Sequence, residues 1–364
     1  MKPHDAVVVG GSFCGSYCAR ELARRGVETT VLEEHNQPGK FHKCSGLFSK
    51  TGLESLGLKH EPCVLNEIRG ARFHAGRIEA TVARSSTVAL ACDRQKLDEI
   101  TASEAMTAGA RFKFNSHAES VKKNGGGFKV ALANGRTENS RVLVGADGCN
   151  STVARSLEFP IIPARDFVLA WEAEFERCNA EKEFVHVILD VDEYGGFFAW
   201  AIPLDEGVRI GMATRNFKRL NAAKESLLRN PVVAAMQPSR KKREFNHLIP
   251  LACRTRTQNE NCLLVGDAAG QVKATTGGGI VLGGKCAAIA AREIAESLQQ
   301  GTPLAYENAW RAEVGGTLAA HALLRKAYNA LPAETVPAML AMAKTFGATT
   351  LASAFGDMDY LVKR

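Results

Sequence analysis

A glycine-rich turn follows a short apolar run near the start of the chain. The run covers residues 5–9 and leads into GGSFCG, where Gly10 and Gly15 keep the spacing of a G-x-G-x-x-G turn and Ser12 replaces the second glycine. Such a turn lets the backbone approach a pyrophosphate at a helix N-terminus. Glu33 ends the next apolar run, where a carboxylate can accept both ribose hydroxyls. These residues predict a dinucleotide site in which the Ser12 hydroxyl donates to a phosphate oxygen. The alternative is a glycine-rich turn in an ordinary α/β protein.

A second glycine-rich segment reads LLVGDAAGQVKATTGGGI and ends at Ile280. An apolar run leads into Gly266 and Asp267, whose carboxylate can accept a hydrogen bond from a sugar-alcohol hydroxyl. The glycines at 277–279 let a flat ring approach the backbone. The helix that follows directs its positive end at the ring, which suits the negative charge of a reduced flavin. The segment therefore predicts the flavin half of a dinucleotide site.

Two shorter segments lie between these signatures. In VGADGCNS, Asp147 and Gly148 mark a tight turn between an apolar run and a helix. In ACDRQKLDEI, Arg94 begins a helix expected over residues 94–108, where its guanidinium can reach a bound cofactor. Each segment alone is also compatible with a surface turn or a solvated charge, so the order of the segments carries the argument.

The elements that position these residues fall into alternating groups. Residues 67–92 and 166–214 show the alternation of apolar and polar residues that is typical of antiparallel strands. The sequence predicts a mixed α/β fold with a discontinuous Rossmann-like nucleotide-binding domain over residues 1–60, 90–160 and 255–300. An antiparallel β-sheet substrate domain is expected over 61–89 and 161–254. Residues 301–364 are expected to form a helical C-terminal region.

Composition narrows the class of protein. A length of 364 residues suits two closely joined domains, and 45% hydrophobic with 23% charged residues is typical of a soluble globular protein. The ten cysteines form no CxxC pair or His/Cys cluster, which argues against metal sites and a secreted disulfide framework. We expect a cytoplasmic protein with no transmembrane helix, either free or bound to the inner face of the cell membrane. The formal charge of +7 favours anionic partners, but no nucleic-acid motif is present.

The order of these motifs resembles the FAD flavoproteins that include para-hydroxybenzoate hydroxylase. Within that group the chain is similar to geranylgeranyl reductases, especially the archaeal enzymes that act on digeranylgeranylglycerophospholipids. The segments KCSGLFSK, GGFFAWAIP and VKATTGGGI carry the likeness. GGFFAWAIP keeps only the Trp and the final Pro of the family's PxxYxWxFP motif, and Ala274 stands where the family usually has Pro. The likeness covers nearly the whole chain.

The resemblance implies an FAD-dependent reductase that saturates C=C bonds of geranylgeranyl chains on isoprenoid membrane lipids. It implies that Cys44 lines the reaction site and that Phe198, Trp200 and Pro203 contact the isoprenoid chain. The electron donor stays open between NAD(P)H and ferredoxin. The residues expected to contact FAD are Gly10, Ser12, Phe13, Cys14, Gly15, Glu33, Glu34, Cys44, Ser45, Gly46, Arg94, Asp147, Gly266, Asp267, Gly277, Gly278, Gly279 and Ile280.

Other functions remain open at this point. The segment FAWAIP also approaches the WxWxIP motif of flavin-dependent halogenases, so a flavin-dependent monooxygenase or halogenase is one alternative. An FAD electron-transfer protein is another, although the cysteine spacing offers no second redox centre. The basic run at residues 240–243 is expected to be a solvated loop, with contact to anionic lipid headgroups as the functional alternative.

Overall fold

The computed structural model describes residues 4–40, 44–347, 349–350, 353 and 356–362. The chain divides into two compact units, each assembled from three segments. The first unit consists of Met1–His42, Gln95–Asp166 and Pro250–Ala322, and the second of Lys43–Arg94, Phe167–Ile249 and Leu323–Arg364. Helices and several sheets make up both units, which confirms the predicted mixed α/β class.

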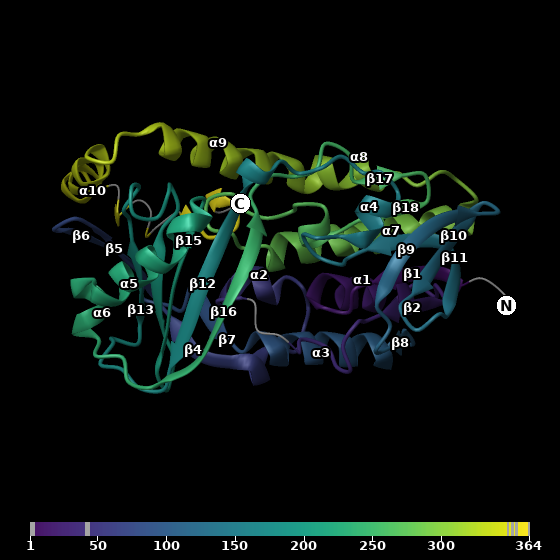
Figure 1. The fold of residues 1–364 in the computed structure, drawn as a ribbon, viewed down its shortest axis with the longest axis horizontal. Coiled ribbons are helices and arrows are strands. Elements are labelled where there is room, and N and C mark those ends of the chain that lie inside the picture. Colours follow the sequence, from purple (N-terminus) through teal and green to yellow (C-terminus); the bar gives the residue numbers. More distant parts are fainter. Residues whose placement is uncertain (1–3, 41–43, 348, 351–352, 354–355, 363–364) are drawn as a thin grey trace. The chain divides into compact units, whose positions relative to one another are not determined.

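An eight-stranded sheet forms the centre of the first unit (Figure 1). Parallel pairs join β8, β2, β1, β11 and β18 in that order, while β17 pairs antiparallel with β18 and the β9–β10 hairpin with β11. Val7, Val8 and Leu143 are fully buried, as expected for parallel strands covered on both faces. The strands are β1 (His4–Val9), β2 (Thr29–Leu32), β8 (Arg111–Lys113), β9 (Ala118–Asn124), β10 (Gly127–Leu132), β11 (Thr137–Gly145), β17 (Gln258–Asn259) and β18 (Cys262–Leu264).

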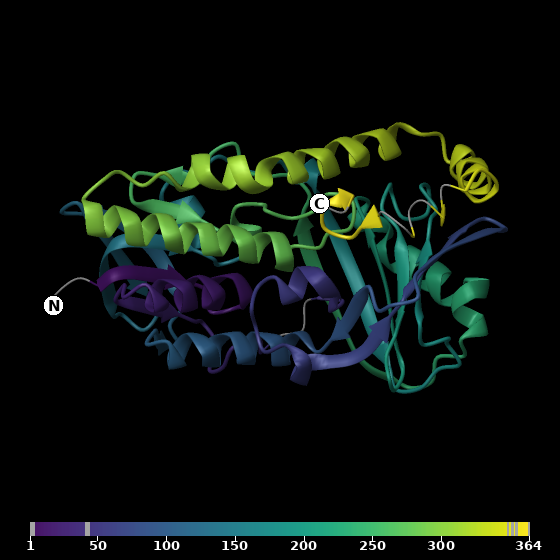
Figure 2. The ribbon, with the colours of Figure 1, turned by 180° about the vertical axis from the view of Figure 1, so that it is seen from behind.

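Two long helices of this unit, α1 and α7, pack against each other (Figure 2). Helix α1 ends before Gly26, which has a φ of +78°, and α7 ends at Gly301 with a φ of +69°. Both glycines adopt the left-handed conformation that commonly ends a helix. The helices are α1 (Phe13–Arg24), α3 (Arg94–Thr107), α4 (Thr152–Ser156), α7 (Ile280–Gln300) and α8 (Tyr306–Trp310). A π-helical turn at Arg311–Gly315 leads into α9 (Gly316–Ala330), which belongs to the first unit up to Ala322 and to the second unit from Leu323 on.

A seven-stranded sheet, in the order β16-β12-β15-β14-β13-β5-β6, forms the centre of the second unit. A smaller sheet pairs β3 and β4 with β7. The strands predicted over 67–92 and 166–214 are present as β4–β7 and β12–β15. The strands are β3 (Leu47–Ser49), β4 (Val64–Ile68), β5 (Gly70–Ala75), β6 (Ile78–Ala83), β7 (Ala89–Cys92), β12 (Phe167–Phe175), β13 (Phe184–Ile188), β14 (Ala199–Pro203), β15 (Val208–Thr214) and β16 (Lys241–Pro250).

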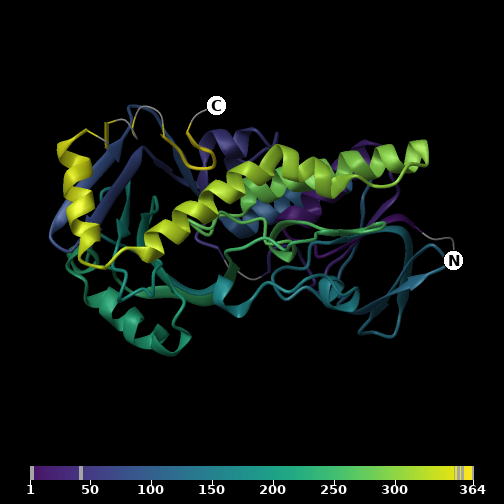
Figure 3. The same cartoon turned by 90° about the horizontal axis from the view of Figure 1, so that it is seen from above.

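Helices cover parts of this sheet. The core residues Trp171, Ile210 and Met212 pack against α5 (Leu220–Arg229) and α6 (Pro231–Ala235). Helix α10 (Thr335–Thr345) packs against β6 and β5 (Figure 3). Helix α2 (Lys50–Glu54) follows β3, and a short pair of strands, β19 (Gly356–Asp357) and β20 (Leu361–Val362), lies in the tail. In the described part of the chain, no helix combines the length and apolar character needed to cross a bilayer.

Several segments differ from expectation. The basic run is not a solvated loop, because Lys241–Arg243 begin strand β16, and Arg240 and Arg243 pair with Glu176 and Glu174. Charged residues on an edge strand also oppose unwanted strand pairing. Residues 43–60 group with the second unit because β3 pairs with β7. Residues 301–322 group with the first unit because α8 packs against α7.

Candidate functional site

The first signature forms a tight turn between β1 and α1. Gly10 has a φ of +99°, and its N–H donates to the Leu32 carbonyl at 2.8 Å. A Cβ on Gly10 would lie 2.4 Å from the Ala146 carbonyl oxygen, and one on Gly15 would lie 1.9 Å from the Gly10 oxygen. Neither position therefore accepts a side chain, and the turn packs directly against the end of β11.

Ser12 is the N-cap of α1, but its hydroxyl does not cap the helix. Its Oγ donates to Asp98 Oδ2 at 3.1 Å. The hydroxyl that we predict to donate to a phosphate oxygen is thus bonded to a carboxylate in this structure. The Ser12 side chain therefore does not cover the N-terminus of α1, whose partial positive charge suits a phosphate. The Phe13 side chain is fully buried and stacks on Tyr17, so only the backbone of Phe13 is available to a ligand.

Glu33 directly follows β2 and reaches the same turn. One carboxylate oxygen accepts from the Gly11 N–H at 2.8 Å, and the other accepts from the His35 N–H at 2.9 Å and contacts its ring Nδ1 at 2.6 Å. Glu33 is buried, whereas Glu34 is exposed and pairs with His117. The sequence analysis did not identify His35 as a partner of Glu33. The only indication in the sequence was its position two residues after Glu33.

The second signature lies beside the first within this unit. The Cys14 sulfur packs against Gly266 and Gly283, since a Cβ on either glycine would lie 2.8 Å from Sγ. These small residues let α1 approach α7 closely. A Cβ on Gly279 would lie 3.3 Å from Asp267 Oδ1, so the glycine loop closes on that carboxylate.

The glycine loop then leads directly into α7. Gly277 has a φ of +73°, and its N–H donates to the Lys273 carbonyl at 2.8 Å, while the Lys273 N–H donates to the Gly278 carbonyl at 3.1 Å. Helix α7 begins at Ile280 with Gly279 as an N-cap that offers no side chain. The N-terminal amides of α7 thus also remain uncapped by a side chain.

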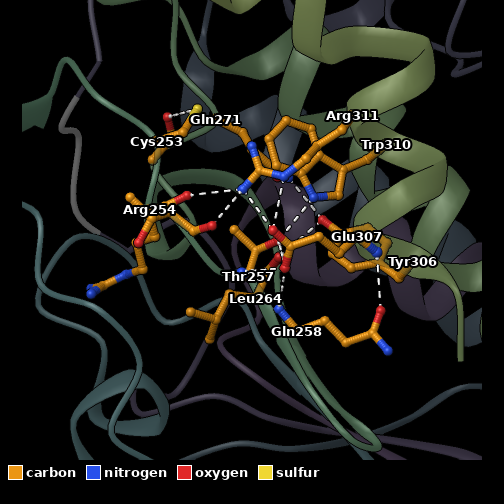
Figure 4. Close-up of polar contacts among 12 residues, drawn as sticks. Cys253, Arg254, Thr257, Gln258, Leu264, Gln271, Tyr306, Glu307, Trp310 and Arg311 are labelled. Atoms are coloured by element: carbon orange, nitrogen blue, oxygen red, sulfur yellow. Dashed lines mark hydrogen bonds and ion pairs between the residues drawn. The ribbon is translucent and has the colours of Figure 1, made fainter.

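A buried chain of hydrogen bonds holds the turn of the second signature (Figure 4). The Gln271 side chain accepts from the Gly266 N–H at 2.9 Å and donates to the Tyr306 hydroxyl at 2.8 Å. Tyr306 in turn donates to the Leu264 carbonyl at 2.9 Å. All three links join the last residues of β18 and the turn to α8, and Gln271 and Tyr306 are fully buried. Tyr306 is therefore a structural support of the candidate site.

A charged group extends this support on the other side of α8 (Figure 4). The Glu307 carboxylate accepts from the backbone N–H groups of Thr257 and Gln258 at 2.7 and 3.0 Å, and Arg311 pairs with it at 2.6 Å. The indole N–H of Trp310 donates to the Thr257 hydroxyl at 2.8 Å. The segment YENAWR thus fixes the strand that leads into the second signature.

Asp147 follows β11 and lies next to the first turn. Its Cα is 3.1 Å from the position of a Cβ on Gly10, and its Oδ2 accepts from the Val153 N–H at 3.0 Å. Burial raises the pKa of Asp147, and its Oδ1 is buried without a hydrogen-bond partner among the described residues. A polar group of a ligand would satisfy this atom, so Asp147 stays a candidate for cofactor binding.

The predicted residues of the second unit form their own group. Cys44 is half-buried, and its sulfur accepts from the Gly46 N–H at 3.4 Å. Gly46 has a φ of +70°, and a Cβ there would lie 2.3 Å from the Cys92 carbonyl oxygen. Arg209 fixes this loop by donating to the carbonyls of Ser45 and Cys92 at 2.8 and 2.9 Å. Arg94, which begins α3, is half-buried.

The aromatic residues of β14 belong to the same unit. The Trp200 indole crosses β15 above Gly211, where a Cβ would lie 2.5 Å from the ring, and donates to Glu172 Oε2 at 2.7 Å. Burial raises the pKa of Glu172 to about 7. Phe198 contacts Trp200 edge-on at 5.9 Å between ring centroids, and Pro203 is buried at the end of the strand. The sequence analysis did not identify Glu172. A glycine within a strand, here Gly211, does indicate the close approach of another group, here the Trp200 indole that binds Glu172.

The residues of the first unit fit FAD. Two glycine turns without room for a Cβ, two helix N-termini without side-chain caps and the unpartnered Asp147 oxygen all suit a dinucleotide with a pyrophosphate. Gly10–Gly15 and Glu33 would hold its adenosine half, and Asp267 with Gly277–Ile280 its flavin half. In the described part of the chain, no group of three or more His, Cys, Asp and Glu side chains could hold a metal ion.

Comparisons with known proteins agree with this geometry. The family described as "FAD binding domain" matches residues 4–309. The digeranylgeranylglycerophospholipid reductase 2 of Methanothermobacter thermautotrophicus is 29% identical over 93% of this chain and 91% of its own. The digeranylgeranylglycerophospholipid reductase of Methanothrix thermoacetophila is 27% identical over 88% of this chain and 86% of its own.

Solved structures share the fold. A geranylgeranyl bacteriochlorophyll reductase-like protein of Thermoplasma acidophilum superposes with a TM-score of 0.87 at 21% identity, covering 99% of this chain and 97% of its own. A myxobacterial chondrochloren halogenase superposes with a TM-score of 0.74 at 18% identity, covering 96% and 91%. The reductase-like protein is thus the more similar of the two.

Proposed function

The chain belongs to the FAD-binding-domain family, and on that premise we propose that it reduces C=C bonds of geranylgeranyl chains on isoprenoid membrane lipids. The observation that carries the proposal is its similarity, over most of both chains, to two digeranylgeranylglycerophospholipid reductases. The uncapped N-terminus of α7 supports it, because a helix N-terminus stabilises the negative charge of a reduced flavin.

Each residue group has a separate task in this reaction. Reduced FAD, when bound, supplies a hydride, and saturation of the bond also needs a proton on the other alkene carbon. Phe198 and Trp200 offer apolar ring surface to the isoprenoid chain, and Glu172 fixes the orientation of the Trp200 indole. Cys44, held in the loop that Arg209 fixes, lines the reaction site. The electron donor is NAD(P)H or ferredoxin.

Contact with a membrane surface is part of the proposal, since the lipid substrate resides there. Met339 and Met342 on α10 are 51 and 59% exposed, Phe346 directly after α10 is 77% exposed, and Leu323 on α9 is 69% exposed. Exposed apolar side chains of this kind favour shallow insertion into a lipid interface.

The test uses lipid mass spectrometry. Purified enzyme, reduced with dithionite and incubated with digeranylgeranylglycerophospholipids, should add two hydrogens to each double bond that it reduces. Cys44→Ser should change the rate or the number of bonds reduced, and Cys44→Ala should have the larger effect if the thiol proton is used. Reduced enzyme that leaves these lipids unchanged but consumes oxygen to hydroxylate or halogenate an aromatic compound would favour the monooxygenase or halogenase function instead.

A further inference from the structure

Helix α9 carries a buried arginine that pairs with no carboxylate of the described residues. Arg325 is 5% exposed, and its guanidinium lies over the Phe197 ring at 4.3 Å from the centroid. Its Nε and Nη2 atoms are buried and have no hydrogen-bond partner among the described residues. A desolvated guanidinium normally pairs with an anion, because leaving the charge unpaired is costly.

The surroundings of Arg325 are also positive. Burial and then the nearby Arg215 lower the pKa of Arg325 to about 10. Arg215 is exposed and contacts the side-chain oxygen of Asn329 at 2.9 and 3.0 Å, with the Asn329 amide donating to the Gly196 carbonyl. The hydroxyl of Tyr328, whose ring centroid is 5.8 Å from the Arg325 guanidinium carbon, is buried and unpartnered among the described residues.

Two acidic residues lie on the adjoining segment, and Asp190 is near enough to add to the effect of burial in raising the pKa of Tyr328. Asp190 accepts from the Glu193 N–H at 2.9 Å, and Glu193 lies 3.6 Å from Arg219. In the part of the chain that the structure describes, neither Arg215 nor Arg325 forms an ion pair with a carboxylate. Two guanidinium groups and a hydroxyl therefore lie close together without an acidic partner among the described residues, a donor set that suits an anion.

An aromatic row connects this cluster with β14. The Phe197 ring beneath Arg325 stacks on Phe198 at 4.5 Å, and Phe198 contacts the Trp200 ring at 5.9 Å. Cationic groups thus lie at one end of a row of apolar rings. This arrangement suits a ligand with an anionic head and a long apolar chain.

We propose that Arg325, Arg215 and Tyr328 bind the phosphate group of a phosphorylated lipid whose isoprenoid chain runs along the half-buried rings of Phe198 and Trp200. The inference rests on the proposed function and assigns the site that recognises the head of its substrate. Arginine suits this task because its planar donors match the oxygens of a phosphate. The anion also relieves the desolvation penalty of Arg325.

Binding tests the site without any turnover. Inorganic phosphate, glycerol 1-phosphate and vesicles of phosphatidic acid in phosphatidylcholine are offered to the wild type, to Arg325→Met and to Tyr328→Phe. Arg229→Met is the matched control, because Arg229 is an exposed arginine on α5 that lies near Glu225. We expect Arg325→Met to weaken glycerol 1-phosphate binding about 10- to 100-fold, Tyr328→Phe to weaken it less, and Arg229→Met to leave it unchanged.

Thermal unfolding separates a binding role from a structural one. Without phosphate, Arg325→Met should melt no lower than the wild type, because it removes an unpaired buried charge. If Arg325→Met fails to fold, Arg325 has a structural role, and Tyr328→Phe, which keeps the ring, then decides the proposal. Equal phosphate binding by wild type and a folded Arg325→Met or Tyr328→Phe variant overturns it.

Kinetics then identify the source of the phosphate. Arg325→Met should raise KM about 10- to 100-fold for a phosphorylated geranylgeranyl lipid, with little change in KM for geranylgeraniol, which lacks the phosphate. Phosphate binding without binding to the phosphatidic acid vesicles or a KM effect would keep the anion site but overturn its assignment to a lipid head. Failure of the wild type to reduce either substrate refutes the proposed reductase, whereas the phosphate-binding result still decides the site.

Discussion

Replacing Glu172 by Gln should make the protein more stable at alkaline pH. The carboxyl group of Glu172, on β12, is buried and accepts a hydrogen bond from the Trp200 indole, and burial raises its pKa from 4.5 to about 7. Between these values the unfolded chain releases the proton while the folded protein keeps it. The free energy of unfolding therefore falls as pH rises from about 4.5 to 7 and then levels off. Gln keeps the acceptor for the indole N–H but does not titrate.

The size of the effect follows from that interval. The difference between the pKa of Glu172 in the unfolded chain, 4.5, and in the folded protein, about 7, corresponds to on the order of 3 kcal/mol in the free energy of unfolding. The groups that face Glu172 are Arg209 on β15, Arg243 on β16 and Glu174 on its own strand. Burial alone would raise the pKa of Glu174, but Arg209 and Arg243 hold it at about 2. The ionisation of Glu174 therefore changes the free energy of unfolding only below about pH 4.5.

Urea unfolding at pH 5, 6, 7 and 8 measures the effect. The stability of Glu172→Gln relative to wild type should increase by on the order of 3 kcal/mol across this range. Burial lowers the pKa of His186 to about 4, which makes stability rise with pH below 6.5, but this contribution cancels in the difference between the variants.

Glu244→Gln is the matched control. Glu244 also accepts a bond from an indole, that of Trp171, but hydrogen bonds from Lys241 and Lys224 hold its pKa at about 2. The stability of the Glu244→Gln variant relative to wild type should therefore not change from pH 5 to 8. A flat difference for Glu172→Gln would refute the assignment of a proton to the buried carboxyl.

Three further predictions concern the candidate site. Glu33→Ala should weaken FAD binding by about 1–3 kcal/mol in titrations of the apoprotein, and unchanged affinity would contradict its assignment to the ribose. Glu307→Gln should lower the melting temperature and weaken FAD binding, because Arg311 loses its partner, whereas Glu313→Gln on the exposed surface should do neither. Trp200→Ala should slow turnover of geranylgeranyl lipids but leave FAD bound, and equal loss of both would show a general folding defect.

The strand–turn–helix segments were predictable because local chemistry fixes them. The apolar run of β1 needs burial on both faces, and the close approach of Gly15 to the Gly10 carbonyl excludes any side chain. The alternation over 166–214 likewise gave the strands β12–β15. In each case the periodicity or the backbone conformation of a few neighbouring residues determines the element.

Strand β16 and the helices that precede it were not predictable in the same way. The residues KKREFNHLIP carry a charged run that is typical of a loop. They form a strand because carboxylates of β12 and the segment after it lie opposite, with Glu174 and Glu176 pairing with Arg243 and Arg240. That pairing depends on strand neighbours far apart in the chain, which periodicity does not reveal.

The supports of the candidate site were hidden for a related reason. Tyr306 and Glu307 lie in a helical segment whose spacing predicts only that one face is buried. Their roles appear when Tyr306 meets the Leu264 carbonyl and Gln271, and when Glu307 meets two backbone N–H groups. Backbone groups have no identity in a sequence, so bonds to them leave no motif.

Glu172 and Glu244 show why residue type alone does not assign chemistry. Both carboxylates accept a hydrogen bond from a tryptophan N–H of the same sheet, at 2.7 and 3.3 Å. Burial lets Glu172 keep a proton near neutral pH, whereas the lysines beside Glu244 keep it ionised. Under the proposed function this difference has a use, because a neutral carboxyl orients the Trp200 indole without placing a net negative charge behind the rings that contact an apolar chain. At the Trp200 end the nearby Arg209 and Arg243 pair with Glu174, whereas Arg325 and Arg215 at the Phe197 end form no ion pair with a carboxylate of the described residues, and it is there that the proposed site would bind a charged head.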